Sequence, residues 1–308
     1  MNMHGDPTTM TLTRPAAPAV TTPAAATPTR WHRVYHGLFG GDLLGLLGLV
    51  LLAVLLGIAL FGPMLVTHDP LLTTPKVLLP PSSEHWLGTD HFGRDVFSRT
   101  MTSLRTDFMV AGLGVSGAIL LGAFIGLICG YYGGWFDDLV MRFVDIIQSF
   151  PLLLIAMVLI LVIGPGVESI ILVTMLINIP TYARLIRGEA MRKKTLEYID
   201  AARCSGATES SIIFRHLMPN TLGPIVIQGS LNLAAAVSNV AALSFLGVGI
   251  RPPVPDLGVM VAEGTNYLAQ GAWWMSVCPG LVLAATIFSL NLMGDWLEGR
   301  LDPRRQEI

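Results

Sequence analysis

Charged residues are scarce in this chain. Only 13% of its 308 residues are Asp, Glu, Lys or Arg, 52% are hydrophobic, and the mean hydropathy is +0.62. Soluble domains carry about 25% charged residues. This composition excludes an ordinary soluble globular domain and predicts a protein that resides in a membrane.

Several motifs of catalysis and metal binding are also missing. Cys129, Cys204 and Cys278 are scattered, with neither a CxxC pair nor a Cys/His ligand spacing, so we expect no disulfide framework and no zinc site. No GxxxxGK[ST] segment and no Gly-Lys pair occur, which argues against a nucleotide phosphate site. HExxH and GxSxG are absent as well. We therefore expect a chain that is not an enzyme and that carries no cofactor.

Six apolar segments account for most of the hydrophobic residues. Each is close to the ~20 residues with which a helix crosses a bilayer. Pro151 and Pro180 interrupt the third and fourth, and Gly164-Pro165-Gly166 predicts a tight turn between them. The expected fold is all-α and integral to the membrane, with six transmembrane helices at Leu43–Phe61, Phe108–Gly130, Ile146–Ile163, Ile170–Leu185, Leu222–Leu246 and Trp273–Met293.

The distribution of basic residues predicts the orientation. With both termini inside, the cytoplasmic segments (the two tails and the loops 131–145 and 184–220) contain 14 Lys and Arg residues, and the outside loops contain 5. This bias follows the positive-inside rule. We expect both termini to be cytoplasmic, with long outside loops at about 62–107 and 247–272.

Four regions follow from this reading. Residues 1–40, rich in Thr, Pro and Ala, are expected to form a disordered cytoplasmic tail. Residues 41–104 hold the first transmembrane helix, read as a retained anchor because no cleavage pattern follows it, and an extracytoplasmic loop. Residues 105–297 form the main transmembrane domain, and 298–308 a cytoplasmic C-terminal tail.

A polar island at 190–220 separates two apolar segments and follows a basic cluster. Thr195 is expected to cap a first short helix, and Gly206 to close it as a C′ glycine. Thr208 would open a second helix, which Pro219 would limit. The island is either a docking site for a cytoplasmic partner or an ordinary solvated loop.

Residue order within the island favours docking. Asp200-Ala201-Ala202, then Gly206, then His216-Leu217-Met218-Pro219 resembles the EAA loop of ABC importer permeases, the element that seats in a cleft of the ATPase subunit. Asp200 stands for the Glu of that motif and Met218 for its Leu. The proposed coupling residues are Tyr198, Asp200, Ala201, Ala202, Gly206, His216 and Pro219.

The outside loops extend the resemblance. HWLGTDHFGRDVFSR, from His85 to Arg99, is similar to the N-terminal signature of the C-type permease subunit in dipeptide, oligopeptide and nickel ABC importers. SFLGVG followed by PPVPDLG resembles a second pattern of that family, with Leu257 in place of Trp. The first signature rests on Gly88, Asp90, Gly93, Arg94 and Asp95.

The resemblance implies a fold, a function and partners. The fold would be that of a type I ABC importer permease, with residues 105–297 as its transmembrane domain and a coupling loop at 190–220. The chain would form half of a peptide pathway in the bacterial inner membrane. It would work with a second homologous permease, cytoplasmic ABC ATPases, an extracytoplasmic solute-binding protein and the lipid bilayer, and with no nucleic acid. Nickel and glutathione are alternative substrates.

Three further points stay open at this level. His85 and His91 beside Asp90 offer metal-ligand chemistry, but loop-stabilising hydrogen bonds and ion pairs are the favoured role of this region, so no metal site is predicted. Gln228, Asn232 and Asn239 lie within about 40° on one helix face and would either line the pathway or hold helices together.

A gradient-driven carrier would need ionisable groups inside the membrane, which the six segments almost lack. A scaffold or sensor subunit is the other rival.

Overall fold

The computed structural model describes residues 43–301, with the side chains of Leu222 and Leu301 excepted. The predictions for the tail at 1–40 and for residues 302–308 lie outside the described residues. Within 43–301 the chain is helical, and its only β pairing is an isolated bridge between Thr89 and Asp95. The all-α prediction is confirmed.

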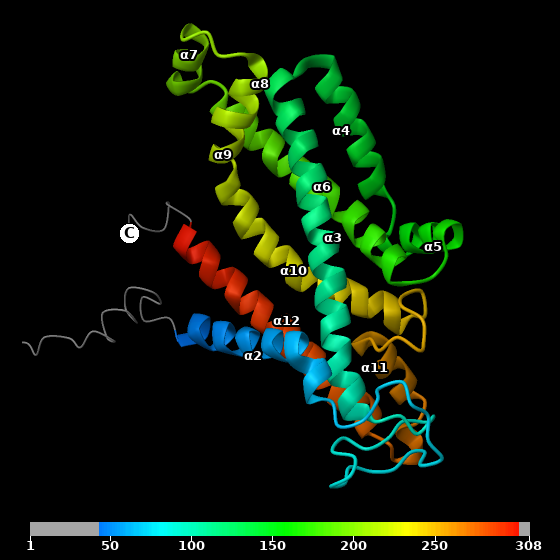
Figure 1. Ribbon diagram of the computed structural model, residues 1–308. Coiled ribbons are helices and arrows are strands. Elements are labelled where there is room, and N and C mark those ends of the chain that lie inside the picture. The colour runs from blue at the N-terminus through cyan, green and yellow to red at the C-terminus, as the bar shows by residue number, and fades with distance from the viewer. Residues whose placement is uncertain (1–42, 302–308) are drawn as a thin grey trace, which may run out of the picture. The chain divides into compact units, whose positions relative to one another are not determined.

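Figure 1 shows the arrangement of the helices. The long ones are α2 (Leu43–Leu65), α3 (Val96–Tyr132), α6 (Val167–Lys193), α10 (Leu222–Phe245) and α12 (Trp274–Leu301), and the shorter ones include α4 (Gly134–Ser149), α5 (Leu152–Ile163) and α11 (Leu257–Thr265). All five long helices are long and apolar enough to cross a membrane. Residues 66–95, here called the cap loop, connect α2 to α3.

The third predicted span is wrong as a single helix. Residues 146–163 are divided between α4 and α5, which are bent by 95° at a short break. Phe150 adopts an extended backbone, as the residue before a proline tends to, and Pro151 has no N–H to continue the helix. Residues 134–145, expected to form part of a cytoplasmic loop, are helical instead. The pair α4 and α5 can count as a sixth span only together.

Other parts of the prediction differ as well: α6 ends at Lys193 and not at Leu185, and α12 ends at Leu301 and not at Met293. α3 begins at Val96, so residues 96–107, placed by the sequence in the outside loop, are helical and include Asp107. α6 continues through Pro180, which we expected to interrupt it. Pro180 is buried, and a proline is tolerated inside a membrane helix when neighbouring elements cover the freed backbone groups.

The helices α3 and α6 are closely packed. A Cβ at Gly126 would lie 2.3 Å from the carbonyl oxygen of Ala183, and one at Gly130 would lie 2.6 Å from that of Arg187. Only glycine permits this approach, which brings the two backbones together as small residues do in membrane helix pairs. Tyr182 of α6 is fully buried beside this contact.

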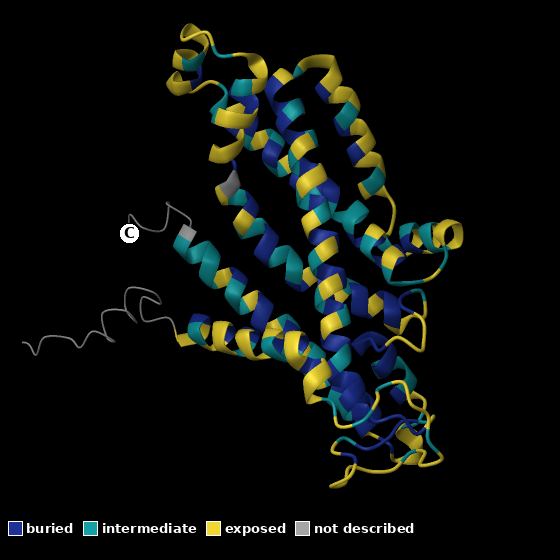
Figure 2. Cartoon of the chain, in the orientation of Figure 1, coloured by how far each residue is buried: buried dark blue, intermediate teal, exposed yellow. Residues whose placement is uncertain are grey.

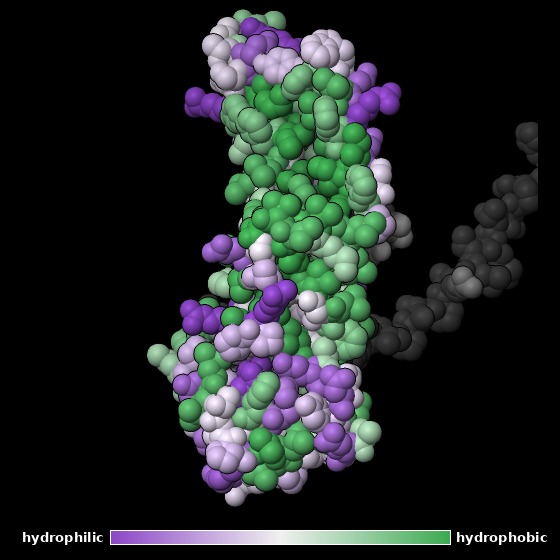
Figure 3. Space-filling model, turned by 90° about the vertical axis from the view of Figure 1, so that its right-hand side faces the viewer, coloured by the Kyte–Doolittle hydropathy of each residue, from purple (hydrophilic) through white to green (hydrophobic). Residues whose placement is uncertain are grey.

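Apolar side chains cover the middle of the described structure. Figure 3 shows a hydrophobic zone between two hydrophilic ends on the face in view. α5 is exposed along most of its length and buries only Ala156, as its colouring in Figure 2 shows. Such exposed apolar surface is expected of a helix that faces lipid or a partner subunit.

Candidate functional site

The polar island folds into a compact unit at the end of the helices that lies opposite the cap loop (Figure 1). This docking segment, residues 197–220, contains α7 (Glu197–Cys204), α8 (Glu209–Ser211), the π-helix η1 (Ile212–Leu217) and α9 (Met218–Asn220). The prediction of two short helical parts joined by a turn is confirmed.

Gly206 makes the turn between them. It has φ of +79°, a conformation that residues with a Cβ rarely adopt. The Gly206 N–H donates to Arg203 O at 2.9 Å, and the Ala207 N–H donates to Ala202 O at 3.1 Å. These two bonds form a Schellman motif, which satisfies carbonyl groups left free at the end of α7. The prediction of a C′ glycine is confirmed.

The predicted limits of the two helical parts are confirmed only in part. Thr208 caps the second helical part, because the Ser211 N–H donates to its Oγ1 at 3.4 Å. The prediction for Thr195 is wrong: its hydroxyl donates to Arg192 O at 3.0 Å, and Leu196 holds the cap position of α7. Pro219 does not end the second part, which runs to Asn220.

Apolar side chains fix the docking segment to the transmembrane helices. Ile199 of α7 and Ile212 and Leu217 of η1 are fully buried. They pack in one cluster with Leu127 of α3 and Ile186 of α6. Burying such a side chain contributes about 1.5–3 kcal/mol. The segment is therefore attached to α3 and α6 by its apolar side chains.

Polar contacts at the end of α3 reinforce this attachment. The Tyr131 hydroxyl donates to Glu209, and Arg203 Nη2 donates to the same hydroxyl at 3.4 Å. Lys194 Nζ donates to the carbonyl oxygens of Gly130 and Tyr131 at 2.9 and 3.0 Å, which neutralises the C-terminal end of the α3 dipole. The hydrogen bond to the Tyr131 hydroxyl raises the pKa of Arg203.

The sequence-predicted coupling residues lie together on this segment. Tyr198 and Asp200 of α7 are exposed, and Asp200 pairs with Arg203 at 3.3 Å. The remaining predicted residues are either exposed (Ala201, Gly206 and Pro219) or half-buried (Ala202 and His216). The segment thus has a buried apolar side and an exposed side of mixed polarity.

The five signature residues of the cap loop and its end are all buried. Asp90 Oδ1 accepts from the N–H groups of Phe92 and Arg94, and its Oδ2 accepts from Arg94 Nε at 2.6 Å. Arg99 Nε lies 3.7 Å from the same oxygen, and Arg94 also reaches Glu263 of α11 at 3.3 Å. Asp90 is therefore the carboxylate shared by two buried guanidinium groups, and Glu263 adds a second negative charge beside them.

Asp95 and the two glycines complete the cap loop. Asp95 caps α3 by accepting from the Ser98 N–H at 2.8 Å, and its other oxygen lies 2.9 Å from His85 Nδ1. Gly88 and Gly93 have φ of +74° and +72°, and a Cβ at Gly93 would lie 2.0 Å from Thr74 O. Asp90 contacts the two arginines and His85 contacts Asp95, which agrees with a role of these residues in stabilising the loop.

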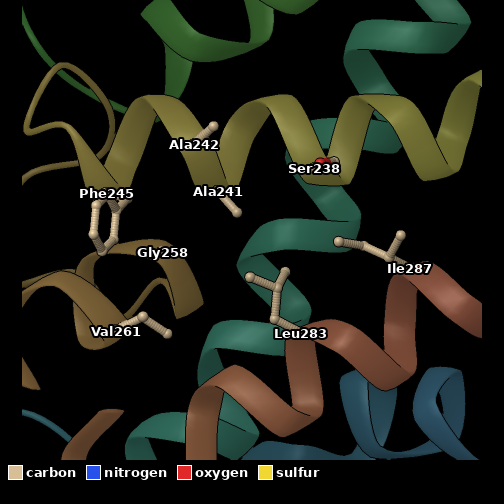
Figure 4. Close-up of a pocket in the computed structure, with 8 residues that line it drawn as sticks. All are labelled: Ser238, Ala241, Ala242, Phe245, Gly258, Val261, Leu283 and Ile287. Carbon is tan, nitrogen blue, oxygen red and sulfur yellow. The ribbon is translucent and has the colours of Figure 1, made fainter. Parts of the chain in front are cut away.

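The polar residues of α10 divide into two groups. Gln228 Nε2 donates to Asn232 Oδ1 at 3.0 Å, and the buried Asn232 amide approaches the Tyr182 hydroxyl of α6. Asn239 lies about two turns further along α10. Near it, Ser238 and Ala241 help to line a cavity of about 210 Å³ between α10, α11 and α12 (Figure 4). The stripe thus approaches α6 at Asn232, whereas Asn239 is not among the residues that line the cavity.

One pair of substitutions distinguishes pathway lining from helix contact for Asn232. If the amide lines a transport pathway, Asn232→Leu and Asn232→Ala should both reduce uptake while the thermal stability of the purified protein stays unchanged. If it joins helices, both should lower the thermal stability of the purified protein by a small amount, since such interhelical bonds average about 0.6 kcal/mol. Uptake by vesicles and unfolding in detergent measure the two outcomes. Unchanged uptake and stability in both variants would contradict both roles.

Sequence reasoning missed several contributors. Tyr131 and Glu209 are separated by 78 residues, and neither belongs to a recognised motif. Arg187 of α6 forms a bidentate pair with the buried Asp137 of α4, at 2.6 Å for both bonds. The sequence shows basic residues near the end of α6 and acidic residues at the start of α4, but no local pattern indicates which of them form ion pairs.

Together, the fold and these loops define a multi-pass membrane subunit with a docking segment at one end and an ordered cap at the other. The chain belongs to the family of binding-protein-dependent transport system inner membrane components, whose match covers residues 118–307.

Named relatives support this assignment. The chain is 36% identical over 262 residues to a dipeptide transport system permease protein of Alkalihalophilus pseudofirmus, covering 85% of this chain and 86% of the relative. It is 36% identical to a probable D,D-dipeptide transport system permease protein of Escherichia coli, covering 83% and 86%. A glutathione transport system permease protein of Pectobacterium atrosepticum is 37% identical, covering 73% and 74%.

A solved structure supports the fold. The MetNI methionine ABC transporter in an inward-facing conformation matches with a TM-score of 0.53 and 18% identity, over 66% of this chain and 96% of that chain. This likeness concerns the fold alone. It agrees with the type I ABC importer permease fold expected from the sequence, and the family makes the chain a permease component of a transport system.

Proposed function

We propose that the chain forms half of a peptide translocation pathway and that it couples this pathway to ATP hydrolysis by docking cytoplasmic ATPases on residues 197–220. The observation that carries the proposal is the construction of this docking segment. Its exposed side presents Tyr198 and Asp200, while Ile199 and Ile212 fix it to the ends of α3 and α6. A movement of the docked ATPase would therefore be transmitted through the segment to α3 and α6.

The energy source lies outside this chain in the proposal. The sequence has no P-loop, so the chain would not hydrolyse ATP itself. A second homologous permease would complete the pathway, and the exposed apolar side chains of α5 would face it or the lipid bilayer. The chain would reside in the bacterial inner membrane, and a solute-binding protein would dock on the side of the cap loop. The family argues against the gradient-driven carrier.

Peptides are the substrate class that we propose. Three of the named relatives are permeases for dipeptides or glutathione, which is itself a small peptide-like molecule. Glutathione is the second candidate, supported by the relative that is 37% identical. Nickel remains the alternative implied by the loop signature. Binding of dipeptides, glutathione and Ni²⁺ to the cognate solute-binding protein would decide among them.

Co-purification tests the coupling role. Full-length protein extracted in mild detergent should bring down a P-loop ATPase, and the complex should hydrolyse ATP faster when the loaded solute-binding protein is added. A matched Asp200→Lys variant should lose the ATPase, because it reverses the charge of an exposed motif residue. Uptake without any associated ATPase would contradict the proposal and would restore the carrier hypothesis.

Cysteine labelling tests the orientation. In a variant without the native cysteines, a membrane-impermeant reagent added outside should label cysteines placed at Ser83 and Val254, which are exposed. It should not label cysteines at Thr195 or Glu307 until the membrane is opened. Labelling of position 195 from outside would place the docking segment on the wrong side for a cytoplasmic ATPase.

A further inference from the structure

Two carboxyl groups meet inside the protein where α3 approaches the start of α11. Asp107 lies in α3 and is 3% exposed, and Asp256 lies at the N-cap of α11 and is 0% exposed. The Val259 N–H donates to Asp256 Oδ1 at 2.8 Å. The second oxygen of Asp256 and both oxygens of Asp107 are shielded from solvent, and they receive no N–H or O–H donor at normal geometry from the described residues.

The surroundings do not compensate two negative charges. Leu104 of α3, Leu257 of α11 and Leu55 of α2 form an apolar cluster at this place. The polar groups that act on the pair, besides the two carboxyls themselves, are the Ser244 hydroxyl of α10 and N–H groups at the start of α11. Among the described residues, no Lys, Arg or His belongs to the groups that act on the two carboxyls. An ionised carboxylate buried without a counter-ion is strongly unfavourable.

A single shared proton removes one of the two negative charges and the repulsion between them. Two ionised carboxylates can only accept hydrogen bonds and repel each other, whereas a protonated carboxyl has one O–H that it can donate to the other. The Asp107 and Asp256 side chains are placed for a mutual hydrogen bond. Of the three oxygens that otherwise have no donor, one then carries the proton and a second accepts it.

We propose that Asp107 and Asp256 form a proton-binding site, in which one shared proton clasps α3 to the start of α11. The ligand is a proton, and the site does not depend on the substrate that the permease carries. Because α11 also holds Glu263, the partner of Arg94, the clasp and the cap loop act on the same short helix. Deprotonation would leave two buried negative charges and would release α11 from α3.

The pH dependence has a definite sign. Burial raises the pKa of Asp256 in the folded protein above its ordinary value. A raised carboxyl pKa means that the folded state binds the proton more tightly than the unfolded state. The contribution of the pair to stability is therefore complete at low pH. It falls as the pH rises from about 4, by up to a factor of ten in the unfolding equilibrium per pH unit, until the folded-state pKa is passed.

Infrared spectroscopy tests the proton directly. Full-length wild-type protein in lipid vesicles at pH 7 should show the C=O stretch of a protonated carboxyl, and the difference spectrum against Asp107→Asn should contain that band. The matched control Asp69→Asn removes an exposed carboxylate, so its difference spectrum should contain carboxylate bands only. A wild-type spectrum without any protonated carboxyl at pH 7 would overturn the proposal without reference to a variant.

A pH series of unfolding tests the clasp. In Asp107→Asn and Asp256→Asn, an amide N–H replaces the shared proton and does not titrate in this range. The thermal midpoint of the wild-type protein should fall from pH 5 to pH 8 relative to both variants, and Asp69→Asn should follow the wild type. If one variant fails to fold, the other supplies the comparison. Parallel curves for the wild type and a folded variant would overturn the proposal.

Discussion

Gly206→Val should abolish uptake while the protein remains inserted in the membrane. The residue has φ of +79° and no atom lies within 4 Å of the place where its Cβ would be, so the effect would come from the backbone and not from a clash. A left-handed conformation costs ordinary residues about 1–2 kcal/mol, and a β-branched residue more. Without the Schellman turn, α7 and the second helical part would lose their fixed relation, and ATPase association should weaken at least about tenfold. Pull-down from detergent and uptake by vesicles measure the two effects.

Gly206→Asn is the matched control for this experiment. Asparagine adopts left-handed conformations more readily than other non-glycine residues, so this variant should keep most of the association and uptake. A graded series of Gly, Asn and Val would attribute the loss to backbone conformation. Normal association and uptake in Gly206→Val would contradict the role of the docking segment.

The parts of the structure that the sequence predicted are those encoded locally. The length of the apolar segments predicted most ends of the five long helices to within a few residues, because a bilayer sets the length that a helix requires. The start of α3 and the ends of α6 and α12 are the exceptions. The turn at Gly206 was predictable, since glycine after a short amphipathic helix points to one backbone conformation. The cap at Thr208 followed from the same kind of short-range rule.

The errors arose where tertiary contacts overrule a local rule. Pro180 was expected to interrupt α6, but its neighbours bury it and the helix continues. Pro151 does break its helix, and the resulting bend of 95° depends on packing that no local pattern specifies. Asp107 was placed in a loop because hydropathy assigns a charged residue to water. Its partner Asp256 lies 149 positions away in the chain, so only the folded structure brings the two together.

The cap loop depends on long-range charge balance in the same way. Asp90→Ala should destabilise the protein strongly, because it leaves the side chains of Arg94 and Arg99, which are 4% and 1% exposed, without their shared counter-charge. Removing one partner of a buried ion pair typically costs about 3–5 kcal/mol. Glu263 still pairs with Arg94 and acts on Arg99 only from a longer distance, so Arg99 would lose its nearest counter-charge. Unfolding in detergent and proteolysis within residues 66–95 measure the loss.

Two comparisons separate this charge effect from a general loss of contacts. Glu84→Ala removes the ion pair with Lys76, in which both side chains are at least half exposed, and it should leave stability unchanged. Adding Arg99→Met to Asp90→Ala should recover part of the lost stability, because an apolar side chain of similar length needs no counter-charge. If Asp90→Ala were as harmless as Glu84→Ala, the buried network would not hold the cap loop in place. If the double variant were the least stable, the loss would come from packing and not from the unpaired guanidinium.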